Sequence, residues 1–362
     1  MLKNSLKYLS GFLIFTSIAI SIPTPAASLD NLDINGYFSF EYEECVKGDA
    51  GCDENGSFDL DLIDLVFNFQ LSNHLRIATD ITWEHGTATE DNRGNAAVEY
   101  AFAEYFVNDL VKFRAGKMFT HFGIYNEIHT AKPATLTVKE PITTNKNNKL
   151  GSEFRFYPRW NTGIAMLGDV EFEDKELNYI IQLSNGDDDK SNPYEKNANK
   201  NKAFNSRVRI NWNNNIGFGL SYYQDKINHY DGAGVKDGTT SITSYGGQVE
   251  YESTSGIGLE AEYVAGKVRT FDQKNINRDA YTLMFYYRLD EIFTPYLRLE
   301  HLDPNENIPS DHGKVKILGV NILTDENMYL KFEFNKTTTG ANNLKYSGDD
   351  FSEIKSSISI GF

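Results

Sequence analysis

Basic side chains gather in one segment of this otherwise acidic chain. Between Phe119 and Trp160 the sequence holds six basic residues: Lys132, Lys139, Lys146, Lys149, Arg155 and Arg159. The segment has three acids, Glu127, Glu140 and Glu153, so its formal charge is +3, whereas the whole 362-residue chain carries −16. Such cations favour contact with anions if the segment lines a narrow passage. The alternative is that they are solvated surface charges.

Two other groups of residues invite a chemical interpretation. Cys45 and Cys52 are the chain's two cysteines and lie close together in "ECVKGDAGC", which predicts a disulfide in an oxidising compartment. A ring of this size stabilises a fold by about 2.5 kcal/mol in the chain-entropy model. His121 and His129 share the basic segment, but no third ligand stands at a defined spacing, so we expect no zinc site.

Acidic stretches and histidines elsewhere point to no reaction. The stretches Asn185–Asn192 and Asp303–Gly313 contain several carboxylates that could hold Ca²⁺, but neither follows a complete ligand spacing. We therefore favour solvated charge there. The seven histidines are scattered over the chain, and no set of Ser, His and acid resembles a hydrolytic site. We expect no catalytic residues, cofactor, metal or nucleic-acid partner.

Apolar and polar residues alternate along much of the chain, which indicates strands. Clear runs are "LRIATDITWE" at 75–84, "YTLMFYYRL" at 281–289 and "LKFEFN" at 330–335. A period of two places one set of side chains on each face of a strand. Counting such runs predicts sixteen strands, at 32–44, 57–71, 75–85, 96–108, 111–118, 162–172, 176–184, 205–214, 216–225, 243–253, 257–269, 278–289, 293–302, 311–322, 328–337 and 350–362.

The connections between these strands are of two kinds. Tight turns such as Asn108-Asp109 and Glu173-Asp174-Lys175 follow the even strands, whereas longer polar segments such as Phe119–Asn161 and Lys226–Ile242 follow the odd strands. Turns at one end and loops at the other are typical of even-stranded transmembrane barrels. We therefore predict an all-β, antiparallel transmembrane barrel of about sixteen strands. A soluble β-sandwich is the alternative, but it would need two or three domains and no linker is visible.

The first residues favour export. Lys3 and Lys7 precede an uncharged, mostly apolar stretch, Tyr8–Ile22, and small residues follow at Ala26 and Ala27. This order is typical of a secretory signal peptide. We predict a signal peptide at 1–27 and a barrel domain at 28–362, located in a bacterial outer membrane.

A barrel of sixteen strands is wide enough to hold water. The faces predicted to point inward carry acids and bases alike, among them Lys112, Arg114, Arg207 and Arg209. The third long connection, Phe119–Trp160, exceeds the usual length of a structureless loop, and we expect it to fold into the lumen. Its six basic residues and these four wall residues are then the candidates for lining a constriction.

The last residues, "SSISIGF", end the chain on Phe362. Ile354, Ile358, Ile360 and Phe362 share one face, so we predict that this strand pairs with the first and shows Phe362 to the membrane interface. By resemblance to other outer-membrane proteins, the terminal Phe362 is also a candidate signal for the barrel assembly machinery.

One part of the chain resembles a known family. "EYAFAEYFVNDLVKFRAGKMFTHFGIYNE" (Glu99–Glu127) and "YPRWNTGIAML" (Tyr157–Leu167) are similar to segments of the phosphate-selective porins. Arg114 and Gly116 match the family's Arg-Xaa-Gly strand, whereas His121 replaces the proline before Phe122-Gly123. The resemblance implies a sixteen-stranded channel that forms homotrimers.

Together these features predict an outer-membrane porin for passive diffusion of small hydrophilic solutes, with a weak preference for phosphate-like anions. Its expected partners are membrane lipid, lipopolysaccharide, the assembly machinery, and small anions or other small solutes. The alternatives from other classes are a surface receptor or adhesin and a hydrolase acting at the barrel rim.

Overall fold

Sixteen antiparallel strands make up almost all of the regular structure. The computed structural model describes residues 31–48, 55–84, 96–144, 150–186, 200–213, 215–230 and 236–362. Within them the strands are β1 (Leu32–Lys47), β2 (Ser57–Ser72), β3 (Leu75–Glu84), β4 (Ala97–Asn108), β5 (Val111–Phe119), β6 (Trp160–Phe172), β7 (Lys175–Ser184), β8 (Ala203–Trp212), β9 (Ile216–Tyr230), β10 (Lys236–Glu252), β11 (Ile257–Arg269), β12 (Asn275–Tyr287), β13 (Phe293–Asp303), β14 (Gly313–Asp325), β15 (Met328–Thr339) and β16 (Phe351–Gly361). Their number and order confirm the prediction.

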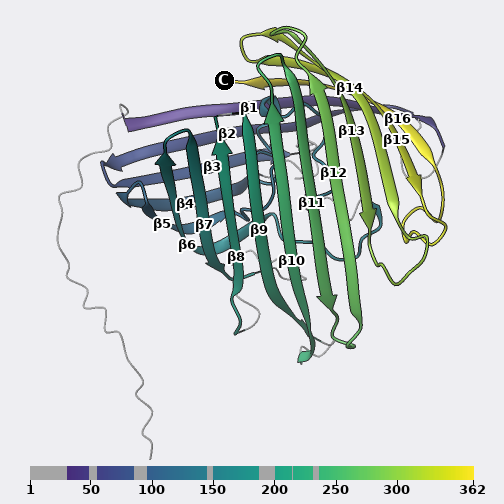
Figure 1. Ribbon diagram of the computed structural model, residues 1–362, viewed down its shortest axis with the longest axis horizontal. Coiled ribbons are helices and arrows are strands. Elements are labelled where there is room, and N and C mark those ends of the chain that lie inside the picture. Colours follow the sequence, from purple (N-terminus) through teal and green to yellow (C-terminus); the bar gives the residue numbers. More distant parts are fainter. Residues whose placement is uncertain are drawn as a thin grey trace, which may run out of the picture.

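The strands close into one barrel in which each pairs with its neighbours in sequence (Figure 1). The last strand, β16, returns to pair with β1, with Ser39 opposite Ser359 and Tyr37 opposite Gly361. Phe362 completes this seam. Its N–H donates to the carbonyl of Gly36 at 3.0 Å, and the N–H of Gly36 donates back to the carbonyl of Phe362 at 2.7 Å. No edge strand remains in the barrel.

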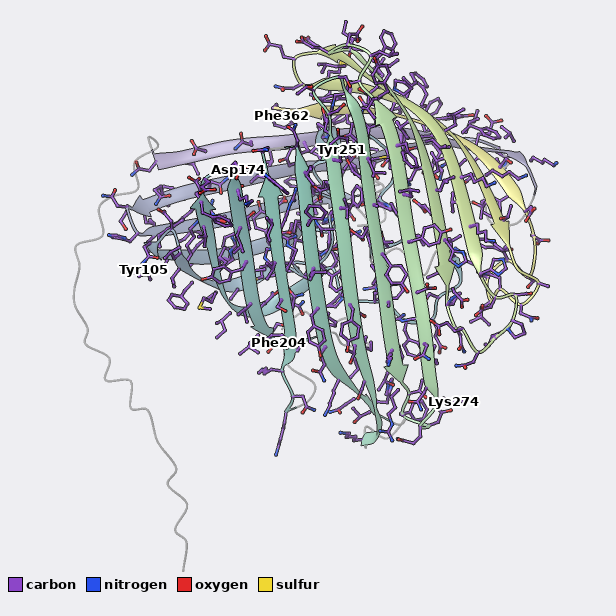
Figure 2. The ribbon with its side chains drawn as sticks, viewed as in Figure 1. Tyr105, Asp174, Phe204, Tyr251, Lys274 and Phe362 are labelled. Atoms are coloured by element: carbon purple, nitrogen blue, oxygen red, sulfur yellow. The ribbon has the colours of Figure 1, made fainter. Side chains whose placement is uncertain are left out.

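Turns and loops lie at opposite ends. Connections of two residues join β2 to β3, β4 to β5, β6 to β7 and β14 to β15. Asp174 of one such turn and Phe362 lie at one end of the barrel, whereas Lys274 lies at the other (Figure 2). Because bacterial barrels turn tightly on the periplasmic side, the end with Asp174 is the periplasmic end and the end with Lys274 is the external end.

Two predicted connections differ from the structure. The segment Lys226–Ile242 is mostly strand rather than loop, because β9 and β10 keep pairing out to Tyr230 and Lys236. Asn228 and Thr240 are buried there, so the extra length of this hairpin still packs against the protein. The connection from β11 to β12, residues 270–274, is as short as a turn, so long and short connections do not alternate strictly.

The outer face of the barrel is apolar. Side chains such as Phe113, Ile164, Leu220, Phe285 and Leu318 are exposed there, and polar residues of the same strands point the other way. Aromatic residues cluster near the periplasmic end, where Trp212, Tyr251, Tyr287, Phe293 and Phe362 are all exposed. A closed barrel with an apolar outer belt and an aromatic girdle is suited to lipid. The chain is therefore a protein of the bacterial outer membrane.

Several predictions fall wholly or partly outside the described residues. The predicted signal peptide, 1–27, lies outside them, and it stays a prediction. Cys45 lies near the end of β1 and is disulfide-bonded. Cys52 itself lies outside the described residues. In the described part of the chain, no helix is long and apolar enough to cross a bilayer.

The seam at Phe362 can be tested in cells. Deleting Phe362, or replacing it with Asp, removes its two main-chain hydrogen bonds or puts a charge at the membrane interface. We expect the amount of protein assembled in the outer membrane to fall several-fold while synthesis is unchanged, as measured by surface labelling and heat-modifiability on gels. Phe362→Tyr, which keeps the aromatic ring, serves as the control. Normal surface levels of the deletion variant would contradict the closing role.

Candidate functional site: the lumen and its inward loop

The segment between β5 and β6 runs through the lumen, as predicted. We call residues 120–159 the inward loop; its described parts are 120–144 and 150–159. Its main chain is held by the barrel wall at widely separated strands. The N–H of Ile124 donates to Glu262 of β11 at 2.7 Å, and the N–H of Val138 donates to Glu333 of β15 at 2.8 Å. The loop therefore crosses the lumen from the side of β5 to the far wall.

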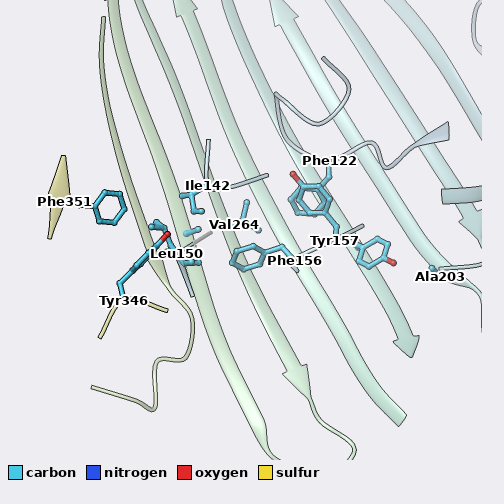
Figure 3. Close-up of a cluster of buried hydrophobic side chains, with 12 residues drawn as sticks. Phe122, Ile142, Leu150, Phe156, Tyr157, Ala203, Val264, Tyr346 and Phe351 are labelled. Atoms are coloured by element: carbon cyan, nitrogen blue, oxygen red, sulfur yellow. The ribbon is translucent and has the colours of Figure 1, made fainter. Parts of the chain in front are cut away.

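Apolar side chains seat the loop against the inner wall. Phe122 and Phe156 are fully buried, and the rings of Phe122 and Tyr157 stack with centroids 4.2 Å apart (Figure 3). The wall offers small residues at these places. A side chain at Gly246 would collide with Phe122, and one at Gly266 would collide with Phe156. Hydrophobic packing thus fixes a segment that the sequence shows mainly as polar and basic.

Two of the predicted constriction cations are paired with wall carboxylates. The ammonium group of Lys139 contacts Glu41, and it also lies 3.3 Å from Glu43 and 3.5 Å from Asp61. Lys132, on the short 3₁₀ helix Lys132–Ala134, lies 3.3 Å from Asp61. Burial alone would lower the pKa of Lys139, but Glu41, Asp61 and Glu43 raise it well above its usual value. Lys139 is therefore charged, and its charge is offset.

The other predicted cations of the loop have different surroundings. Arg159 is buried, with its guanidinium 3.8 Å from Glu140. Arg155 is exposed, and its carbonyl accepts a hydrogen bond from Arg278 of β12. Lys146 and Lys149 lie outside the described residues. The net +3 of the segment is thus not gathered at one point of the described lumen.

On the wall, Arg207 and Arg209 of β8 have acidic partners. Arg207 pairs with Glu127 of the inward loop, and Arg209 pairs with Glu250 of β10. Glu127 also contacts the ring of His121. Burial would raise the pKa of Glu127, but Arg207 and His121 outweigh it and hold the pKa well below its usual 4.5. This ion pair anchors the loop to β8.

Lys112 and Arg114 belong to a cationic patch on β3–β5 that remains in contact with solvent. Arg114 and Arg76 share one carboxylate, Glu104, each at 2.6 Å, and Lys112 lies 2.5 Å from Asp169. Three basic side chains thus face two acids, which leaves +1. The side chain of Arg76 is 31% exposed and that of Glu104 only 2%, whereas Asp169 is 40% exposed, so one base and one acid of the patch reach solvent.

A polar cavity lies at the periplasmic end of the lumen. It has a volume of about 390 Å³ and lies near the periplasmic ends of β8–β12. Its lining includes Arg209, Glu250, Glu252, Glu260 and Arg288. Charges that line a water-filled space avoid the cost of burial in an apolar interior.

The sequence did not predict the wall side chains that donate hydrogen bonds to the main-chain carbonyls of the inward loop. Arg278 donates to the carbonyl of Phe154, Arg298 donates to the carbonyl of Lys139 at 2.9 Å, and Lys331 donates to the carbonyl of Lys132 at 2.6 Å. All three bases are almost fully buried. Alternation identifies Arg298 and Lys331 as inward residues, but no sequence signal distinguishes a base that lines water from one that binds a loop carbonyl.

Comparisons with known proteins agree with this fold. No protein-family model matches the sequence, and no curated protein matches it. The chain is similar in structure to an anion-selective porin from Comamonas acidovorans, with 12% identity, a TM-score of 0.66, and 91% of this chain and 99% of that chain covered. It is also similar to Salmonella typhi OmpF in complex with daunomycin (13% identity, TM-score 0.62, covering 91% and 97%).

A third similar structure is OmpT of Vibrio cholerae, an outer-membrane protein folded in vitro and described in trimer form. Its identity is 10%, its TM-score is 0.55, and the match covers 91% of this chain and 99% of that chain. At such low identities the likeness establishes the fold alone. The neighbours are thus outer-membrane barrels, several of them porins.

The apolar packing of Phe122 and Phe156 predicts that the inward loop can detach from the wall while the barrel stays folded. Phe156→Ala should remove about 3–5 kcal/mol of packing, because Phe156 is fully buried. We expect trypsin to cleave after Lys139 much faster in this variant, while the barrel keeps its heat-modifiability. Phe218→Ala, on the exposed outer face, is the control and should leave cleavage unchanged. Equal cleavage of the two variants would contradict the packing role of Phe156.

The Arg207–Glu127 pair predicts a pH dependence of stability. The folded-state pKa of Glu127 lies below the usual 4.5. The stabilisation that ionised Glu127 gives the folded state is therefore complete above pH 4.5 and is lost as the pH falls through the lowered pKa. Arg207→Gln should therefore destabilise the protein by about 2 kcal/mol at pH 7. This is less than the cost of breaking a fully buried ion pair, because both partners are partly exposed. The difference from the parent should shrink as the pH falls below 4.5.

Thermal unfolding followed by gel mobility between pH 3 and pH 7 measures this difference. Arg288→Gln, in a half-exposed pair at the periplasmic end, is the control and should cost under about 1 kcal/mol. A destabilisation by Arg207→Gln that does not change with pH would contradict the account of Glu127.

Proposed function

We propose that the protein is a porin, a channel for passive diffusion of small hydrophilic solutes across the outer membrane. The observation that carries this proposal is the inner face of the barrel: a closed ring of sixteen strands with partly exposed charges of both signs around an inward loop. Rings of this size hold water, and their lining charges act on passing ions.

We further propose a weak preference for anions, carried by the wall rather than by the loop. The loop cations Lys132 and Lys139 have acidic neighbours, so they are poor candidates for a bare positive constriction. The patch of Arg76, Lys112 and Arg114 is the better candidate, because its three bases face two acids and Arg76 is partly exposed. Phosphate-like anions suit neighbouring guanidinium groups such as those of Arg76 and Arg114, which agrees with the family resemblance.

The assembly is proposed to be a homotrimer, as in the trimer form of the similar Vibrio cholerae protein.

We also propose that the protein has no enzymatic activity, because its inner charges are distributed as ion pairs with the wall and the loop rather than as a nucleophile with its base. Lipopolysaccharide and the assembly machinery remain the expected partners. Among the residues that the structure describes, no specific contact favours the receptor or adhesin alternative.

Planar-bilayer recording tests the channel and its selectivity together. Arg76→Gln with Arg114→Gln changes the patch from +1 to −1, a swing of two charges. We expect the parent to conduct without added substrate and to prefer anions weakly. The double variant should shift the anion-to-cation permeability ratio about two- to fivefold toward cations, most strongly at low salt.

Lys274→Gln is the matched control, because it also removes a positive charge but at an exposed external site. Its reversal potential should equal that of the parent. A parent that does not conduct would contradict the porin proposal. Conduction with a reversal potential unchanged in the double variant would contradict only the assignment of the patch.

A further inference from the structure

His129 of the inward loop meets two glutamates of the barrel wall. Its imidazole lies beside Glu99 of β4 and Glu84 at the end of β3. One ligand atom from each of the three residues lies within 4.8 Å of the others. His129 and Glu99 are almost fully buried, whereas Glu84 is exposed. An exposed third member leaves this group a route from solvent.

The hydrogen bonds of His129 decide which ring nitrogen faces the glutamates. Nδ1 lies 3.0 Å from the carbonyl oxygen of Asn126, and a carbonyl can only accept, so Nδ1 carries a proton. In a neutral imidazole Nε2 then presents a lone pair. Nε2 lies 3.1 Å from Oε2 of Glu99, which presents a lone pair as well. Two lone pairs at this distance need a metal cation between them, or a proton on Nε2 or on Glu99.

The distances and outer contacts suit a metal ion. Zinc binds nitrogen and carboxylate oxygen at 2.0–2.2 Å, so two ligands of a tetrahedral ion lie about 3.3 Å apart. The 3.1 Å between Nε2 and Oε2 is close to that value. The indole N–H of Trp160 donates to Oε2 of Glu99 at 2.7 Å. Metal-binding histidines and carboxylates are held by second partners of this kind.

Other carboxylates make the surroundings strongly negative. Asp64 of β2 and Asp80 of β3 are fully buried on the same part of the wall, and both interact electrostatically with Glu99. Oδ1 of Asp80 has no hydrogen-bond partner among the described residues. Burying an unpaired carboxylate is costly unless a cation lies nearby. Arg159 interacts electrostatically with Glu99, but its guanidinium also lies 3.8 Å from Glu140.

We propose that His129, Glu99 and Glu84 bind one divalent transition-metal ion, such as Zn²⁺, between the inward loop and strands β3 and β4. One nitrogen and two carboxylate ligands leave a position for water. The ion offsets the negative charge of Glu99 and of the nearby Asp64 and Asp80. It also links the inward loop to the wall on the side where the loop enters the lumen. This site does not depend on solute transport, so it stands apart from the proposed channel function.

Metal titration of the purified, detergent-folded protein tests the proposal. After removal of metal with a chelator, Co²⁺ is added and its visible absorption is followed, and Zn²⁺ binding is measured by calorimetry. We expect one ion per chain. His129→Gln, Glu99→Gln and Glu84→Gln should each weaken binding at least about tenfold, and Trp160→Phe, which removes the donor to Glu99, should weaken it about tenfold as well.

A second group of possible ligands provides the matched control. Asp279, His301 and Asp303 also lie within 4.8 Å of one another, on β12 and β13. His301→Gln should leave the stoichiometry and affinity unchanged. Loss of binding in His301→Gln, or undiminished binding in His129→Gln, would overturn the assignment. Absence of binding by the parent would overturn it too and would identify the His129–Glu99 contact as an imidazolium–carboxylate pair.

Discussion

The structure depends on one constraint, which is that a backbone in lipid cannot leave its hydrogen-bonding groups unpaired. Each unpaired N–H or carbonyl costs several kcal/mol in a bilayer, so a sheet must close. Here closure joins the first strand to the last, with β1 opposite β16 and the main chains of Phe362 and Gly36 hydrogen-bonded in both directions. The apolar outer face, the polar inner face and the separation of turns from loops all follow from that closed ring.

Closing sixteen strands creates a lumen that side chains alone do not fill. The inward loop occupies it through two kinds of contact. Apolar residues such as Phe122 and Phe156 pack against glycines of the wall, and buried bases such as Arg298 bind the loop's carbonyl oxygens. Two described loop cations, Lys132 and Lys139, pair with wall acids as a consequence. We propose that electrostatic selectivity then depends on wall charges that stay in contact with water, such as Arg76.

Sequence periodicity was enough to predict the strands and the closure, because each depends on which face a residue occupies. The inward loop was predicted from a different signal, the unusual length of the segment Phe119–Trp160. Periodicity failed for the ends of β9 and β10, whose polar residues predicted a loop. In the structure these ends pair as strands, and Asn228 and Thr240 are buried there. Periodicity also could not pair Lys139 with Glu41, or His129 with Glu99, since those residues lie far apart in the chain and meet only when the loop folds inward. Spacing carries no information about such contacts.

The seating of the inward loop in the lumen is the central claim, and hydrogen–deuterium exchange tests it most directly. We predict that amides such as those of Ile124 and Val138, which donate to Glu262 and Glu333, exchange as slowly as amides of the strands. Amides of the external connection 304–312 should exchange much faster. If Ile124 and Val138 exchange as fast as that connection, the loop is not held in the lumen and the account of the site is wrong.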